Sequence, residues 1–331
     1  MAGNRQRALV RTESPGAPSN GLSRLGRKHI ADIQRARMLA AMLQECAERG
    51  VANVAVAHVV GRSGVSRRTF YEVFEDREDC FLAAFEEALA RAAAVVVPAF
   101  EQPGTWRSKT RAALTAFVEF VATDLAAGRL LIVESAAAGP GAREQRHNTI
   151  QQIIPIVDRG RTEAKAGADP PPLTAQGIVG GVLSVLHTRL AEEDPGDLLD
   201  LIGPLMGMIV LPYLGPATAR KELKRPEPKR RVEPLPARRD PLRDLEMRLT
   251  YRTVRTLMAV AEQPGSSNRA VGARAGIPDQ GQISKLLARL HNLGLIENTT
   301  AASARGEPNA WTLTTRGWEI HGAIAQQTVT A

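Results

Sequence analysis

The sequence is poor in the residue types that several classes of protein need. Two cysteines in 331 residues are too few for a disulfide scaffold, so we expect a reducing, cytoplasmic compartment. Aromatic residues make up only 4%, which disfavours a β-sandwich. The longest apolar run, 201–214, is broken by Pro204 and Pro212 and is too short to span a bilayer. No signal-peptide pattern opens the chain, and we expect no membrane partner.

The usual signatures of enzyme and metal chemistry are also missing. The sequence contains no zinc-like Cys/His cluster, no phosphate-binding P-loop and no Gly-x-Ser-x-Gly motif. Cys46 and Cys80 lie in helical patterns, which favours a packing role over a redox role. We therefore predict that the protein is not an enzyme, and that it has no metal site and no cofactor.

The net charge of +8 is unevenly distributed. Residues 1–37 carry +6, residues 38–214 carry −6, residues 215–245 carry +5 and residues 246–331 carry +3. An acidic middle between basic ends suggests that the ends meet a polyanion. The alternative is that basic tails and linkers only keep the chain soluble.

Helical periodicity runs through most of the chain, and alanine and leucine are plentiful, so the predicted fold is mainly α. Proline and glycine clusters divide the chain. The predicted parts are a disordered basic arm at 1–29, a three-helix unit at 30–77, an all-helical domain at 78–214, a proline-rich basic linker at 215–245 and an α+β unit at 246–325.

A tight turn at Gly64 separates two short predicted helices. The first covers 54–62, and Ser66 caps the second, which runs to Phe74. A long helix follows from Asp76 and is predicted to end at Pro98. Three short helices with such a turn form a helix-turn-helix, whose last helix enters the DNA major groove. The predicted exposed side chains of that helix, which include two arginines able to bind guanine or phosphate, are Ser66, Arg67, Arg68, Thr69 and Tyr71.

The run from Gly64 to Glu78, GVSRRTFYEVFEDRE, resembles the DNA-binding signature of the TetR family of bacterial regulators. The resemblance implies that Tyr71 and Arg77 contact DNA phosphates. It also implies that residues 78–214 are an all-helical regulatory domain that dimerises and often binds a small effector. The second helix departs from the family pattern, because residues 54–56 are Val-Ala-Val where threonines are usual.

Two predicted helices of this domain, 177–190 and 198–211, are apolar nearly all round. A helix that is apolar on every side is buried on every side, so each needs a partner beyond its own domain. A symmetric homodimer built from these two helices supplies that partner, and Gly177, Gly180 and Gly181 allow close approach. Burial inside a monomer is the alternative.

The identity of an effector cannot be read from the sequence. Several side chains are candidates to line a pocket, although each also fits an ordinary core or surface role. Glu134 is the best polar candidate, and His187 also fits a core histidine. The candidate residues are Trp106, Phe117, Phe120, Glu134 and His187.

Residues 246–325 show the order helix, helix, helix, strand, loop, strand, which is typical of a winged helix. The unit resembles the DNA-binding domains of the MarR class through the runs 282–290, 293–296 and 311–314. Glutamine and asparagine suit adenine, and lysine suits guanine or phosphate. The candidate DNA contacts are Gln282, Ser284, Lys285, Arg289 and Asn292 on the third helix and Arg305 on the wing. Because the unit carries only +3, contact with a protein is the alternative.

Together these features predict a sequence-specific, dimeric, ligand-responsive repressor that binds a double-stranded DNA operator. We expect it in the cytoplasm, associated with the nucleoid, and with the winged helix as a second DNA-binding head. The alternative is an architectural or adaptor protein without an effector, whose winged helix contacts protein.

Overall fold

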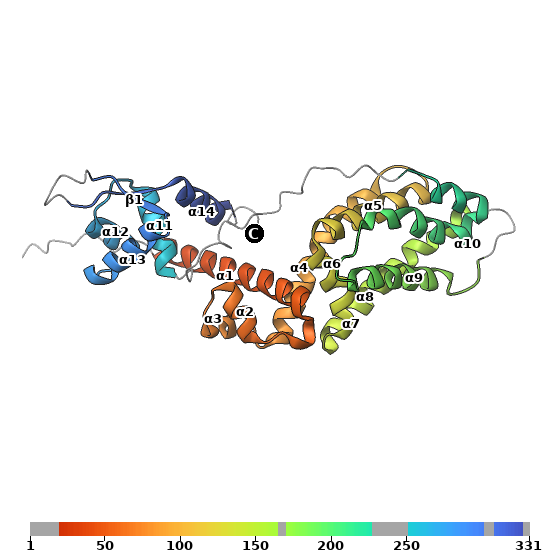
Figure 1. Cartoon of the computed structure of the whole chain (residues 1–331), viewed down its shortest axis with the longest axis horizontal. Coiled ribbons are helices and arrows are strands. Elements are labelled where there is room, and N and C mark those ends of the chain that lie inside the picture. The colour runs from red at the N-terminus through yellow and green to blue at the C-terminus, as the bar shows by residue number, and fades with distance from the viewer. Residues whose placement is uncertain (1–19, 165–169, 227–250, 301–307, 327–331) are drawn as a thin grey trace, which may run out of the picture.

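The computed structural model describes residues 20–164, 170–226, 251–300 and 308–326. The protein is mainly helical and elongated, with the N-terminal helices between a helical domain at one end and a C-terminal unit at the other (Figure 1). The N-terminal helices are α1 (Asn20–Arg49), η1 (Val51–Asn53), α2 (Val56–Ser63), α3 (Arg67–Val73) and α4 (Arg77–Glu101), of which α4 continues into the helical domain.

The helical domain packs around α4 and α5. Its further elements are α5 (Trp106–Thr123), α6 (Leu125–Arg129), the π-helix η2 (Leu130–Glu134), α7 (Ser135–Ala137), α8 (Pro140–Asp158), η3 (Arg159–Glu163), α9 (Thr174–Ala191), η4 (Leu198–Leu201) and α10 (Ile202–Leu223). Pro140 and Gly141 lie in the first turn of α8, and residues 194–196 lie between α9 and η4.

The C-terminal unit has three helices, two short strands and a final helix. They are α11 (Tyr251–Glu262), α12 (Asn268–Ala275), α13 (Gln280–Asn292), β1 (Ile296–Asn298), β2 (Trp311–Leu313) and α14 (Thr315–Gln326). The strands pair antiparallel, with Ile296 opposite Leu313, and a single bridge joins Ser266 to Trp311. The order of elements is the predicted one. Because the sheet is this small, the winged helix remains a prediction.

Two predicted boundaries are wrong. Helix α1 begins at Asn20, so residues 20–29 of the predicted disordered arm are helical. Gly21 and Gly26 lie in this stretch, but an isolated glycine costs a helix only ~1 kcal/mol relative to alanine. Helix α4 passes through Pro98 to Glu101, since a proline near the end of a helix disturbs only its last turn.

The predicted linker also begins too early. Helix α10 continues to Leu223, although the chain kinks at Gly215, whose φ of 76° lies in the left-handed region. The kink matches the break expected after residue 214. The helix resumes beyond it because Ala219 and Glu222 are buried. The rest of the predicted linker, 227–245, and the wing residue Arg305 lie outside the described residues.

The buried side chains form two hydrophobic cores. The larger core runs without interruption from α1 through the helical domain to α10. The smaller core belongs to the C-terminal unit, with Leu257, Leu287 and Ile320 fully buried in it, and it also includes Ile33 from α1. The segment Leu198–Leu223 is long and apolar enough to cross a membrane, but 61% of its most apolar 18-residue stretch is buried. A core helix shows the same properties.

Candidate nucleic-acid interface

Helix α3 lies at the outer edge of the N-terminal helices (Figure 1). Gly64 ends α2 with a φ of 66°, a left-handed conformation that glycine adopts without strain. Ser66 then caps α3, with its side chain accepting a hydrogen bond from the Thr69 N–H at 3.0 Å. Val65, Phe70 and Phe74 are buried beneath the helix. The glycine turn and the serine cap therefore set the face that α3 presents to solvent.

Three of the five predicted contact side chains on α3 are exposed. Arg67 lies with its guanidinium carbon 5.9 Å from the centre of the Tyr71 ring, and half of Tyr71 is exposed. Arg68 pairs with Glu72 at 2.9 Å, an exposed contact between residues four apart on the helix. Such a pair contributes little and is readily exchanged for a phosphate. Two arginines and a tyrosine thus lie together on the exposed surface of α3.

Ser66 and Thr69 are placed differently from the other predicted contacts. Both are half-buried, and their hydroxyl oxygens lie 2.8 Å apart. The Ser66 hydroxyl already accepts the capping hydrogen bond from the Thr69 N–H. The structure therefore gives this pair a role in holding the start of α3, next to the exposed arginines.

Helix α2 begins without the threonine cap that is usual in the family. Its N-cap is Ala55, which has no capping side chain. Instead, His58 Nδ1 accepts a hydrogen bond from the Ala55 N–H at 3.1 Å. This is the bond that a glutamate or glutamine at the third helical position usually makes to the N-cap amide, so it supports the start of α2 from the other side of the cap.

A carboxylate on α1 fixes α2 in place. Glu45 is buried, and its two oxygens accept hydrogen bonds from Arg62 at 2.5 Å and from Arg49 at 2.6 Å. Arg62 also pairs with Glu48. Burial by itself raises the pKa of Glu45, but the hydrogen bonds from Arg62 and Arg49 and their charges outweigh it and lower the pKa below its usual range. These ion pairs hold the support on which α3 rests.

Arg77, the predicted phosphate contact, binds the backbone of the protein itself. Its side chain is only partly exposed, and Nη1 donates to the carbonyl oxygens of Val51 at 2.8 Å and Val54 at 3.2 Å. These carbonyls belong to the η1 turn between α1 and α2. Because the guanidinium binds the protein's own backbone, its first role in this structure is to hold that turn against α4. Sequence reasoning missed this role, since the two carbonyls lie more than twenty residues away.

Glu134 meets the same turn from the other side. It ends the π-helix η2, and its Oε2 accepts a hydrogen bond from the Val51 N–H at 2.6 Å. The preceding helix contributes Arg129, which donates to the carbonyl oxygens of Leu190 in the last turn of α9, Glu192 just after α9 and Ala47 on α1. The segment 129–134 therefore joins the helical domain to the DNA-binding helices. π-helical turns often occur at functional sites.

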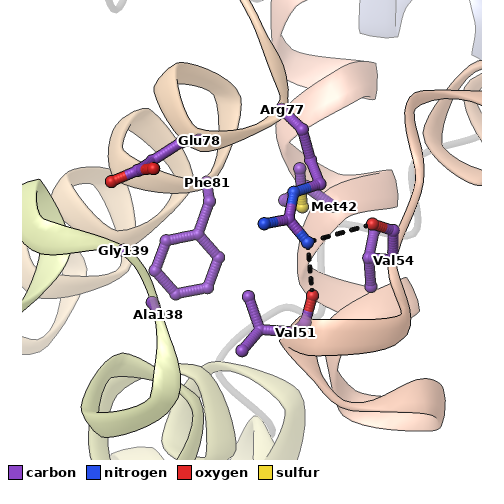
Figure 2. A pocket seen from close by; sticks show the side chains of 8 residues that line it. All are labelled: Met42, Val51, Val54, Arg77, Glu78, Phe81, Ala138 and Gly139. Atoms are coloured by element: carbon purple, nitrogen blue, oxygen red, sulfur yellow. Dashed lines mark hydrogen bonds between the residues drawn. The ribbon is translucent and has the colours of Figure 1, made fainter.

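A shallow pocket marks this junction (Figure 2). In the figure the guanidinium of Arg77 points to the Val51 and Val54 carbonyls across from Phe81. The pocket has about 230 Å³ of empty space, including its open mouth. It is lined by Met42, Val51, Val54, Arg77, Glu78, Phe81, Ala138 and Gly139.

The predicted effector-pocket residues do not converge. Trp106 is buried in the core, donates from Nε1 to the Ile156 carbonyl and packs against Tyr213. Phe117 and Phe120 lie on the same helix as Trp106 but more than ten residues along it, or at least ~15 Å, and Phe120 is buried. Glu134 lies at the junction, and His187 is exposed on α9. The role of these five residues in an effector pocket therefore stays a prediction.

The predicted contacts in the C-terminal unit are mostly exposed. Lys285, Arg289 and Asn292 lie on the solvent face of α13. Gln282 accepts a hydrogen bond from Arg252 at 2.8 Å. The side chain of Ser284 is half-buried, and its hydroxyl oxygen accepts a hydrogen bond from Asn268 at 3.0 Å. This contact joins α13 to α12. Among the described residues, no three His, Cys, Asp or Glu side chains cluster as metal ligands would.

Comparison with known protein families finds a match within the N-terminal helices. Residues 38–84 match the family model of bacterial regulatory proteins, tetR family. No curated protein matches the chain.

Several solved structures resemble it over about half of its length. The fatty acid degradation regulator FadR from Bacillus halodurans is 16% identical with a TM-score of 0.48, and the match covers 54% of this chain and 94% of that one. FadR from Bacillus subtilis, solved with stearoyl-CoA, is 19% identical with a TM-score of 0.47, and the match covers 53% of this chain and 97% of that one. A tetR-family regulatory protein from Rhodococcus RHA1 is 16% identical with a TM-score of 0.45, and the match covers 55% of this chain and 97% of that one. Likeness at this level carries no argument about function.

The segment matched by the family model contains the glycine turn, the capped helix α3 and its exposed arginines. The matched model describes regulatory proteins rather than enzymes. Residues 38–84 therefore match the N-terminal domain of bacterial regulatory proteins of the tetR family, and they contain the two short helices and the glycine turn of a helix-turn-helix.

Proposed function

We propose that this protein is a transcription regulator that binds a double-stranded DNA operator through α3. The observation that carries the proposal is the exposed group Arg67, Arg68 and Tyr71 on a capped helix inside the matched family domain. Arginine pairs bidentately with guanine, and a tyrosine hydroxyl donates to phosphate. The three side chains together supply base reading and backbone contact.

The test is a triple substitution, Arg67→Ala, Arg68→Ala and Tyr71→Phe. All three side chains are exposed, so the fold is expected to survive. Specific operator affinity falls at least a hundredfold, since each bidentate pair is worth about 1–3 kcal/mol. Arg146→Ala, far from α3 on α8, is the control. Unchanged affinity in the triple variant would remove α3 as the reading helix.

We further propose a homodimer formed through α9 and α10. Gly177 and Gly180 are exposed on α9 with open space above them, and Leu211 on α10 is 47% exposed. An apolar helix face edged by glycines suits close packing against a second copy of itself. Gly180→Arg is expected to give a monomer in analytical ultracentrifugation, and Gln152→Arg, an exposed change on α8, to remain a dimer. A dimeric Gly180→Arg variant would refute this interface.

We propose that the regulator is a repressor released by a small effector. The link from Glu134 to Val51 gives the helical domain a direct hold on the turn before α2. A compound that moves η2 would shift α2 and α3 together and lower operator affinity. A compound screen by thermal shift on the full-length protein tests this. The screen must yield a compound that both stabilises the protein and changes operator affinity. An architectural or adaptor protein would bind no such compound.

We also propose that the C-terminal unit is a winged helix that acts as a second DNA-binding head through α13. Exposed Lys285, Arg289 and Asn292 support this role. A pull-down that captured a protein through this face, with DNA affinity unaffected by its substitution, would favour the adaptor alternative.

A further inference from the structure

Helix α1 is shared by both hydrophobic cores. Ile33 is 1% exposed and belongs to the core of the C-terminal unit, with which α1 makes contact through α11. Five residues later Met38 is fully buried in the core of the DNA-binding helices. At 1.5 Å per residue these two side chains are only ~8 Å apart along the helix axis.

Arg35 lies between these two points and contacts the reading helix. Its guanidinium carbon is 5.8 Å from the centre of the ring of Phe74, the residue that ends α3. On α1, the residue that contacts α3 (Arg35) and the residue buried in the C-terminal unit (Ile33) are therefore only two positions apart. In Figure 1 the C-terminal unit accordingly lies beside the N-terminal end of α1, at the far end of the molecule from α9 and α10.

The attachment leaves the basic side chains of the C-terminal unit accessible. Arg269 and Arg274 on α12 and Lys285 and Arg289 on α13 are all exposed. The contact with α1 involves α11, whereas the four basic side chains lie on α12 and α13. Four exposed basic side chains on two neighbouring helices suit the phosphates of a nucleic acid.

We propose that α1 fixes the C-terminal unit beside α3, so that the two bind one continuous stretch of double-stranded DNA. This inference rests on the proposed function of α3 and adds the second half of its binding surface. Neighbouring turns of the major groove on one face of DNA are ~34 Å apart. Both attachment points lie within ~8 Å on α1, so the two heads are held side by side, as heads on neighbouring turns must be. Each protomer then protects about ten base pairs beside the α3 site.

The test is hydroxyl-radical footprinting of an operator with the full-length protein and two variants. Lys285→Ala with Arg289→Ala is expected to lose the flanking protection, keep the protection due to α3, and reduce the slope of log affinity against log salt by about two. Ile33→Asp is expected to detach the unit and make the flanking protection weak and irregular. Ala31→Asp, an exposed change of the same charge two residues away, is the control for Ile33→Asp.

Circular dichroism and thermal unfolding establish that each variant is folded, and the lysine and arginine changes are at exposed positions. If their footprint and salt slope equal those of the wild type, the unit does not bind DNA. If Ile33→Asp keeps its flanking protection in register, α1 does not place the unit. Failure of the α3 proposal is seen separately, as α3-site protection that survives the triple substitution at residues 67, 68 and 71.

Discussion

The carboxylate of Glu134 binds the backbone of Val51, with Oε2 2.6 Å from the amide nitrogen. The carbonyl of the same residue accepts a hydrogen bond from Arg77 at 2.8 Å. One buried residue between α1 and α2 is thus held from the helical domain on one side and from α4 on the other. The turn that precedes α2 and α3 is therefore tied to both elements.

Glu134→Ala is expected to destabilise the protein by about 1–3 kcal/mol, because it leaves the Val51 N–H without its acceptor. Glu134→Gln keeps an acceptor oxygen and is expected to lose less. Urea unfolding measures both variants. Glu144→Ala removes an exposed carboxylate from α8 and is the control, with a change below about 0.5 kcal/mol. A loss for Glu134→Ala no larger than that of the control would show that the contact holds nothing.

A buried ion pair anchors the end of α10. Glu222 is 2% exposed, and its Oε2 accepts from Arg111 Nη1 at 2.6 Å. Glu222→Ala leaves the arginine buried and unpaired, so we expect a loss of about 3–5 kcal/mol in chemical unfolding. Replacing both partners, Arg111→Met with Glu222→Leu, is expected to recover most of it. Exposed Lys221→Ala is the control, and equal losses for the single and double variants would contradict this account.

Much of the local structure could be predicted from the sequence. Ser66, Asp76 and Asp279 cap their helices as expected, and α12 covers the predicted residues 268–275. These features depend on neighbours within a few positions. The resemblance of residues 64–78 to a known signature lies within the segment that the family model matches.

The errors share one physical cause, contact between distant parts of the chain. Arg77 turns to carbonyls 23 and 26 residues before it, and Glu134 to an amide 83 residues before it. Ile33 reads as one more apolar residue of a helix, yet it is buried in a core formed more than 200 residues later in the chain. Periodicity assigns a residue to a face of its helix and does not identify what covers that face.

Gly160 permits a tight contact between two large aromatic side chains. A Cβ atom at this position would lie 2.7 Å from the Trp106 ring and 2.8 Å from Tyr213, and both residues are buried. Gly160→Ala is therefore expected to cost about 1–3 kcal/mol through overpacking. Gly61→Ala is the matched control on α2, where no atom lies within 4 Å, and it is expected to be neutral or stabilising. The difference in melting temperature between the two variants measures the effect.

Both cysteines are expected to be unreactive in the folded protein. Burial raises the pKa of the Cys46 thiol and the Cys80 thiol to about 12, from an ordinary value of 9.0. The thiolate is the reactive form, so a disulfide reagent at pH 8 is expected to modify them only as fast as the protein unfolds. Modification on mixing, without denaturant, would contradict this expectation.

The same thiols make stability depend on pH in the alkaline range. A raised folded-state pKa stabilises the fold fully below the unfolded value, and this contribution is lost as pH rises from about 9 towards 12. Each thiol then removes up to ~1.4 kcal/mol per pH unit, because the unfolded chain ionises and the folded one does not. Urea unfolding of the wild type and of Cys46→Ala with Cys80→Ala between pH 8 and 11 isolates their share. Because the double variant lacks both ionising thiols, it is expected to lose stability less steeply as the pH rises, and parallel curves would show that the thiols contribute nothing.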